Sequence, residues 1–159
     1  MFFEYPTDNN LYIEELCDTQ FLIGPDIMAA PIVEQGKTSR NVYFPLADWY
    51  DLHTGTLYKN GTSTISNVQI TDKVPLFIRI GTAVLLQDTT TVRQTKDLGN
   101  VFRVVGAFFL DTRRSNSTVK YYRSSTSMIG IKDYNDQNKI ATCISQGCEY
   151  VFNMLLTQA

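Results

Sequence analysis

"NVYFPLADWYDLHTG", residues 41–55, has the pattern of two short strands, each closed by a turn. A proline follows the first apolar run, residues 41–44, and Thr54-Gly55 follows the second, residues 49–52. Proline and glycine commonly interrupt strands. The stretch also holds the only tryptophan and the only histidine of the chain. It therefore predicts a β-domain, and it raises the question of whether its aromatic and acidic side chains form a sugar site.

Similar apolar runs recur on both sides of this stretch. Turn-forming residues such as Gly24-Pro25-Asp26 and Gly81 separate them. Asn60-Gly61 is typical of a two-residue hairpin turn, and we expect it to join residues 56–59 to residues 63–68. Strands at intervals of about 8–12 residues indicate an antiparallel β-sandwich or barrel. The predicted strands of the first half are 21–23, 27–33, 41–44, 49–52, 56–59, 63–68, 76–80 and 83–86.

The second half of the chain also has the pattern of a β-domain. Residues 87–100 are polar with few apolar anchors, which is typical of a connection between two units. Five further apolar runs follow. The expected fold class is therefore all-β: an antiparallel β-sandwich in residues 19–90, a linker in 91–100 and a second β-domain in 101–159. Residues 1–18 fit neither unit.

Composition excludes several classes of function. The chain has 159 residues, 43% of them hydrophobic and 19% charged, which is a globular composition. A formal net charge of −2 gives no basic surface for nucleic acid or for an anionic membrane. No apolar run approaches the roughly 20 residues of a membrane span. Because residues 1–4 lack the features of a signal peptide, we expect any secretion signal to lie upstream.

Candidate catalytic groups are few. Glycoside hydrolysis needs a pair of carboxylates, and the formal pairs are Glu14 with Glu15, Asp48 with Asp51, and Asp26 with Glu34. A Ser-His-Asp triad would have to use His53, which we expect in a turn. Glycine-rich phosphate loops are absent from the sequence, as is the cysteine and histidine spacing of a zinc site. The sequence therefore predicts no metal, no organic cofactor and no catalytic residue.

Two interpretations of the Trp49 stretch remain. Trp49 and Tyr50 could form a stacking platform for a sugar. Alternatively, Trp49 points into a sandwich core, and Asp51 accepts hydrogen bonds from the turn that ends at Gly55. We favour the second interpretation because it gives every residue of the stretch a role.

Four further residues are candidates for covalent modification. Asn60-Gly61-Thr62 and Asn116-Ser117-Thr118 are possible N-glycosylation sites in turn-like sequence. Cys143 and Cys148 could form a disulfide. A four-residue hairpin loop would place the two cysteines opposite one another, whereas a two-residue turn at Gln146-Gly147 would not.

Six short motifs, in order, resemble glycoside hydrolase family 31, the α-glucosidase family. "FEYP" matches the segment at the end of that family's catalytic barrel, and "QFLIG" and "AAPI" follow it. The Tyr-Phe-Pro strand, the Trp-Tyr-Asp turn and "PLFIRIG" complete the order. The motifs occupy residues 3–6, 20–24, 29–32, 43–45, 49–55 and 75–81.

The resemblance implies a place in a larger enzyme. It makes residues 1–18 the tail of a catalytic (β/α)₈ barrel, residues 19–90 the proximal C-terminal sandwich, and residues 101–159 part of a distal β-domain. Both catalytic aspartates of the family lie upstream, so this segment would brace the barrel of a retaining α-glucosidase acting on terminal α-linked glucose. The implied partner is that barrel, in the same polypeptide.

Of two further expectations, the first concerns the surface that would face the barrel. The apolar side chains that would face it should be exposed: Phe2, Phe3, Tyr5, Leu11 and Tyr12. We also expect the parent enzyme in the secretory pathway, either lysosomal or extracellular. The alternative function is a free-standing carbohydrate-binding or adhesion sandwich that uses Trp49 and Tyr50 as its platform.

Overall fold

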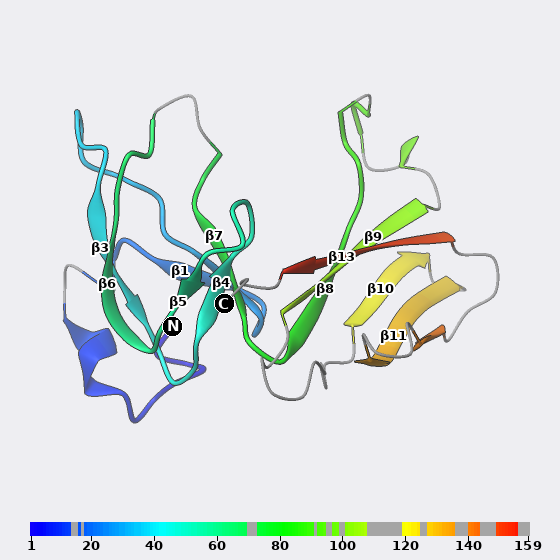
Figure 1. The fold of residues 1–159 in the computed structure, drawn as a ribbon, viewed down its shortest axis with the longest axis horizontal. Coiled ribbons are helices and arrows are strands. Elements are labelled where there is room, and N and C mark those ends of the chain that lie inside the picture. Colours follow the sequence, from blue (N-terminus) through cyan, green and yellow to red (C-terminus); the bar gives the residue numbers. More distant parts are fainter. Residues whose placement is uncertain are drawn as a thin grey trace. The chain divides into compact units, whose positions relative to one another are not determined.

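A computed structural model describes two compact units, one containing Met1–Ile80 and one containing Gly81–Leu156 (Figure 1). The described residues are 1–13, 16, 18–69, 73–90, 92–94, 97–98, 101–107, 119–124, 127–135, 140–143 and 149–155. Apart from a short 3-10 helix, η1 (Asn9–Tyr12), the elements are strands, which confirms the all-β prediction. No helix in these ranges is long and apolar enough to cross a membrane.

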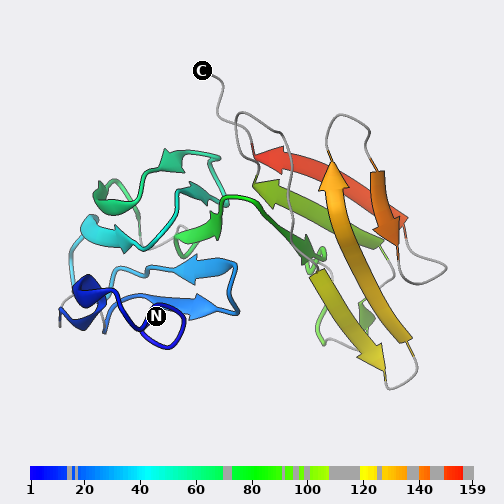
Figure 2. The ribbon, with the colours of Figure 1, turned by 90° about the horizontal axis from the view of Figure 1, so that it is seen from below.

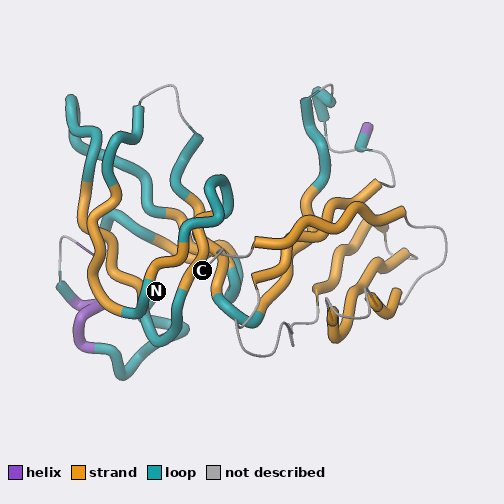
Figure 3. The backbone as a smooth tube through the Cα atoms, viewed as in Figure 1, coloured by secondary structure: helices purple, strands orange, loops and turns teal. Residues whose placement is uncertain are grey.

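The first unit is a sandwich of two sheets. A five-stranded antiparallel sheet has the order β1-β2-β7-β4-β5, and a two-stranded antiparallel sheet pairs β3 with β6. The hairpin of β1 and β2 is visible in Figure 2, and loops connect the other strands (Figure 3). The strands are β1 (Phe21–Ile23), β2 (Ile27–Ala29), β3 (Arg40–Phe44), β4 (Trp49–Asp51), β5 (Leu57–Tyr58), β6 (Gly61–Ile65) and β7 (Leu76–Arg79).

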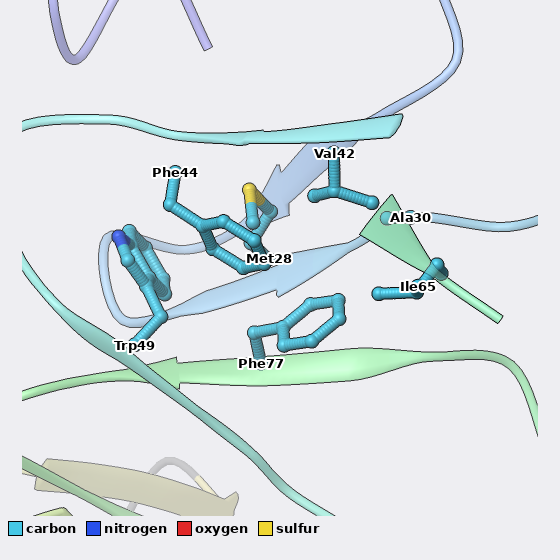
Figure 4. Close-up of a cluster of buried hydrophobic side chains, with 7 residues drawn as sticks. All are labelled: Met28, Ala30, Val42, Phe44, Trp49, Ile65 and Phe77. Atoms are coloured by element: carbon cyan, nitrogen blue, oxygen red, sulfur yellow. The ribbon is translucent and has the colours of Figure 1, made fainter. Parts of the chain in front are cut away.

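Side chains from both sheets of the first unit form one core. Val42 and Phe44 of β3 point toward Phe77 of β7, and Trp49 lies beside them (Figure 4). Phe44 stacks on Tyr58 with ring centroids 4.9 Å apart, and it meets Phe77 edge-on at the same distance. Offset and edge-to-face contacts are the favoured geometries of aromatic pairs. The buried residues of this cluster are Met28, Ala30, Val42, Phe44, Trp49, Ile65 and Phe77.

The predicted hairpin at Asn60-Gly61 is wrong. β5 pairs with β4, whereas β6 pairs with β3, so these two residues carry the chain from one sheet to the other. Gly61 has a φ of 110°, a region that glycine enters without steric cost. The Asn-Gly pair therefore marks a change of direction, as its chemistry suggests, but the change is a crossover between sheets.

The second unit contains two three-stranded sheets. One is antiparallel, in the order β10-β11-β12; in the other, β9 pairs with β8 antiparallel and with β13 parallel. β8 thus pairs with a strand of the second unit, although the sequence analysis placed residues 83–86 within 19–90. Half of the predicted linker, 91–100, lies outside the described residues. The strands are β8 (Thr82–Leu86), β9 (Val101–Ala107), β10 (Val119–Ser124), β11 (Ser127–Asn135), β12 (Ile140–Cys143) and β13 (Glu149–Leu155).

Candidate functional site

The Trp49 side chain is buried and cannot serve as a sugar platform. Both Trp49 and Tyr50 have 0% of their surface exposed. The Trp49 indole Nε1 donates to the Pro45 carbonyl at 3.2 Å, so the polar end of the ring has a partner inside the fold. This geometry confirms the core interpretation of Trp49, and it overturns the alternative in which Trp49 and Tyr50 stack on a ligand.

Asp51 organises the turn that follows β4, as the sequence analysis expected. Its Oδ1 accepts from the backbone N–H of His53 at 2.7 Å and from that of Thr54 at 2.8 Å. Gly55 closes the turn with a φ of 74°, and its N–H donates to the Asp51 carbonyl at 2.9 Å. His53 lies in this turn, with Nε2 3.0 Å from the Val74 carbonyl. The whole stretch therefore has a structural role.

The other candidate carboxylates have structural partners too. Asp48 accepts from Lys59 Nζ at 2.7 Å and from the Asn60 backbone N–H at 3.0 Å. The hydrogen bond to Asp48 also raises the pKa of Lys59. Asp26 pairs with Arg79 at 3.1 Å, a half-buried contact.

Glu34, the last of the described candidate acids, also has a cationic neighbour. Glu34 lies 3.8 Å from Lys37 on the surface. Glu14 and Glu15 fall outside the described residues. Within the described part of the chain, no three His, Cys, Asp or Glu side chains gather where they could hold a metal ion. The described candidate carboxylates therefore contact cations and turn N–H groups, as acids with a structural role do.

The N-terminal segment, residues 1–13, is fixed to the sandwich at one buried cluster. Tyr5 and Leu11 pack with Tyr43 of β3, and Leu11 is fully buried. The expectation that Tyr5 and Leu11 would be exposed is therefore wrong. Both side chains pack against Tyr43 of β3, more than thirty positions away in the chain, and Met1, Leu16 and Leu22 pack on the same cluster.

A hydrogen-bond network reinforces this attachment. Asp8 caps η1 by accepting from the Asn10 backbone N–H at 3.1 Å. The Tyr43 hydroxyl donates to Asp8 Oδ2 at 2.7 Å and accepts from Asn10 Nδ2 at 3.0 Å. Burial raises the pKa of Tyr43, and the hydrogen bond to Asp8 raises it further. The phenol therefore stays protonated and links the N-terminal segment to the sandwich.

Gln20 is a buried polar residue whose role the sequence analysis missed. Its Nε2 donates to the Tyr43 carbonyl at 2.7 Å, and its Oε1 accepts from the Tyr43 N–H at 3.0 Å. The side-chain amide thus satisfies both backbone groups of one residue of β3. The family motif "QFLIG", which begins at Gln20, was the sequence feature that could have pointed to this contact.

Arg40 ties three separate segments together, another role that the sequence did not suggest. Its guanidinium donates to the Pro31 carbonyl at 2.7 Å and to both the carbonyl and the hydroxyl of Thr19. Nε donates to the Asn41 carbonyl at 3.1 Å. Desolvation by burial lowers the pKa of Arg40. These contacts hold the entry to β1 against the loop after β2 and against β3.

Four apolar side chains of the N-terminal segment form an exposed group, which we call the N-terminal aromatic surface: Phe2, Phe3, Tyr12 and Ile13. Phe3 is 90% exposed and Tyr12 is 57% exposed. The rings of Phe2 and Phe3 lie 4.8 Å apart, and those of Phe2 and Tyr12 lie 6.4 Å apart. The prediction of exposure is thus confirmed for Phe2, Phe3 and Tyr12. Grouped apolar exposure of this kind is typical of an interaction surface.

The predicted modification sites are described only in part. Asn60 is exposed at the crossover between β5 and β6, and its Nδ2 donates to the Phe44 carbonyl at 3.0 Å. Cys143 ends β12. Asn116 and Cys148 lie outside the described residues, so the second glycosylation site and the disulfide stay predictions.

Solved structures place the fold in a class, the β-regions of glycoside hydrolases. A GH31 α-xylosidase from Xanthomonas citri superposes on 97% of this chain and 18% of its own, with a TM-score of 0.64 and 22% identity. A cycloalternan-forming enzyme from Listeria monocytogenes, solved with a pentasaccharide substrate, matches 86% of this chain and 13% of its own. Its TM-score is 0.62 and its identity is 25%.

Sequence comparison then identifies the family. The profile of the glycosyl hydrolase family 31 C-terminal domain matches residues 1–84, a little over half of the chain, and the chain belongs to this family. Alpha-glucosidase 2 of Bacillus thermoamyloliquefaciens is 34% identical over 66% of this chain. A probable alpha/beta-glucosidase of Aspergillus flavus is 33% identical over 74% of it. The chain spans only 12% and 13% of the length of these two relatives.

Proposed function

We propose that this chain is the non-catalytic C-terminal β-region of a retaining α-glucosidase, and that it braces a catalytic barrel encoded upstream in the same polypeptide. Family membership and the relatives named as α-glucosidases support the reaction class. Retaining glycosidases use two carboxyl groups about 5–5.5 Å apart. The acids described here cap turns or pair with cations, which supports a role outside the reaction itself.

The observation that carries the bracing role is the N-terminal aromatic surface. Its segment is not loose, because Tyr5 and Leu11 anchor it and the Tyr43 hydroxyl is bonded to Asp8. An anchored segment that nevertheless exposes Phe2, Phe3 and Tyr12 presents a preformed apolar surface. Aromatic side chains bury about 150–250 Å² each at an interface, so three of them supply a substantial contact with the barrel.

The test uses the complete enzyme encoded by the gene. Phe3→Ser should lower the temperature at which α-glucosidase activity is lost irreversibly, while leaving kcat at low temperature close to that of the parent enzyme. Val33→Ser is the matched control, since Val33 is also an exposed apolar residue, at 62%, but lies outside the N-terminal aromatic surface. Equal inactivation temperatures for the parent enzyme and both variants would contradict bracing through this surface.

A second measurement tests the non-catalytic assignment. The purified 159-residue chain should not hydrolyse p-nitrophenyl α-glucoside, because the candidate acids described in it are engaged with turn N–H groups or cations. Turnover above the buffer blank that disappears in Asp51→Asn would overturn the assignment, and it would make the turn after β4 a reaction site.

A further inference from the structure

Asn60 lies at a distinctive point of the first unit, where the chain leaves β5 and enters β6 in the other sheet. Asn60 is exposed, and so is Thr62 two positions later. Together with Gly61 they form an Asn-X-Thr tripeptide, the acceptor sequence for N-linked glycans. The acceptor amide and the hydroxyl-bearing residue are therefore both at the surface.

The contacts of Asn60 leave its amide free to carry a substituent. Nδ2 donates to the Phe44 carbonyl at 3.0 Å, and the backbone N–H donates to Asp48 Oδ1 at 3.0 Å. A side-chain amide nitrogen carries two hydrogens, and the bond to Phe44 uses one of them. A glycosylated amide keeps one N–H, so the folded crossover can hold a glycan and retain the bond to Phe44.

We propose that Asn60 is an N-glycan acceptor in a chain that passes through the secretory pathway. The donor is an oligosaccharide linked to a polyprenyl diphosphate, and a membrane transferase brings the two together. Asn60 Nδ2 bonds to the anomeric carbon of the sugar and releases one proton to the solvent. The bond between that carbon and the diphosphate oxygen breaks, and the polyprenyl diphosphate leaves with the electron pair.

The bond from Asn60 to Phe44 predicts that two ways of removing the glycan give products of different melting temperature. An endoglycosidase that cuts between the two innermost N-acetylglucosamines leaves the amide, with one sugar, in place. A peptide N-glycanase instead hydrolyses the amide and leaves an aspartate at position 60. That aspartate has no N–H for the Phe44 carbonyl, and it places a carboxylate beside this carbonyl oxygen. The second product should therefore melt about 2–8 °C below the first.

The experiment expresses the full chain behind a secretion signal in eukaryotic cells, in an Asn116→Gln background that isolates Asn60. Peptide N-glycanase treatment in ¹⁸O-labelled water should place the label on residue 60. Thr62→Ala should abolish the modification while keeping the Asn60 amide, and Thr62→Ser should preserve it. Occupancy is read on the intracellular pool as well as on the secreted protein, so retention of a variant in the cell does not obscure the result.

Two outcomes would overturn the proposal. An unmodified Asn60 in both pools would remove the acceptor site itself. Occupied Asn60 with equal melting temperatures for the two deglycosylated products would remove the claim that the glycan-bearing amide keeps its bond to Phe44.

Discussion

Two aromatic-rich stretches of the first unit have opposite environments. Trp49 and Tyr50 of β4 are completely buried, whereas Phe2 and Phe3 of the N-terminal segment are 42% and 90% exposed. β4 lies inside a five-stranded sheet, paired with β5 on one side and β7 on the other. The N-terminal segment is held at Tyr5 and Leu11 and leaves its other rings outside. Burial is thus decided by pairing partners that are distant in the sequence.

The largest effect should come from the buried stretch. Trp49→Ala should lower the free energy of unfolding by about 3–5 kcal/mol, because it leaves a cavity in a core shared by both sheets. Urea unfolding followed by circular dichroism measures the change, with Trp49→Phe as a milder control. A loss below about 1 kcal/mol would mean that the Trp49 ring contributes little to stability, and it would contradict the proposed difference between the buried and the exposed stretch.

Gln20 should show the next largest effect, because it holds the strand on which the N-terminal segment rests. Gln20→Met has a similar volume but leaves the Tyr43 N–H and carbonyl without their partners. We expect a loss of about 1–3 kcal/mol and faster hydrogen exchange at the Tyr43 amide. Unchanged exchange there would show that another group satisfies this backbone and that Gln20 is not the link.

The contribution of Tyr43, which links the N-terminal segment to the sandwich, should depend on pH. Its pKa is raised in the folded chain, so its contribution is complete below the unfolded value of about 10 and is lost as the pH rises through the folded value. Tyr43→Phe should cost about 1 kcal/mol near neutral pH and should make the alkaline fall in stability less steep. Urea unfolding at several alkaline pH values measures this fall in stability, with Tyr12→Phe as an exposed control. A larger change in Tyr12→Phe than in Tyr43→Phe would refute the assignment of the alkaline fall to Tyr43.

The smallest effect on stability should come from the exposed stretch. Phe3→Ser in the isolated chain should change the free energy of unfolding by no more than about 0.5 kcal/mol, but it should reduce self-association measured by light scattering. Val33→Ser is the control for general surface polarity. A loss of unfolding free energy comparable to that of Trp49→Ala would show that Phe3 packs within the isolated chain and does not belong to an interaction surface.

Local chemistry explains which features could be predicted from the sequence. The turn after β4 was predictable because Asp51, His53 and Thr54 are neighbours and an aspartate readily accepts from the next N–H groups. Strand positions followed from short apolar runs between prolines and glycines. The family motif at residues 49–55 assigned Trp49 to a structural strand and turn, although its contacts were not known.

Features that depend on distant partners could not be predicted in this way. Asn60-Gly61 has the same turn chemistry whether the chain returns beside β5 or crosses to β3. Tyr5 and Leu11 have ordinary apolar character, and the cluster that buries them depends on Tyr43, which is distant in the sequence. The parallel pairing of β9 with β13 joins segments more than forty residues apart, and nothing in either strand specifies its direction.

Gln20 also limits how the two-stranded sheet can grow. β3 pairs with β6 on one side, and an unpaired outer edge would be a template for a strand from another molecule. At this edge the Gln20 amide occupies the Tyr43 N–H and carbonyl, and the Arg40 guanidinium occupies the Asn41 carbonyl. An incoming strand would have to displace both side chains before it could add to the sheet. Aggregation by strand addition is therefore resisted along β3.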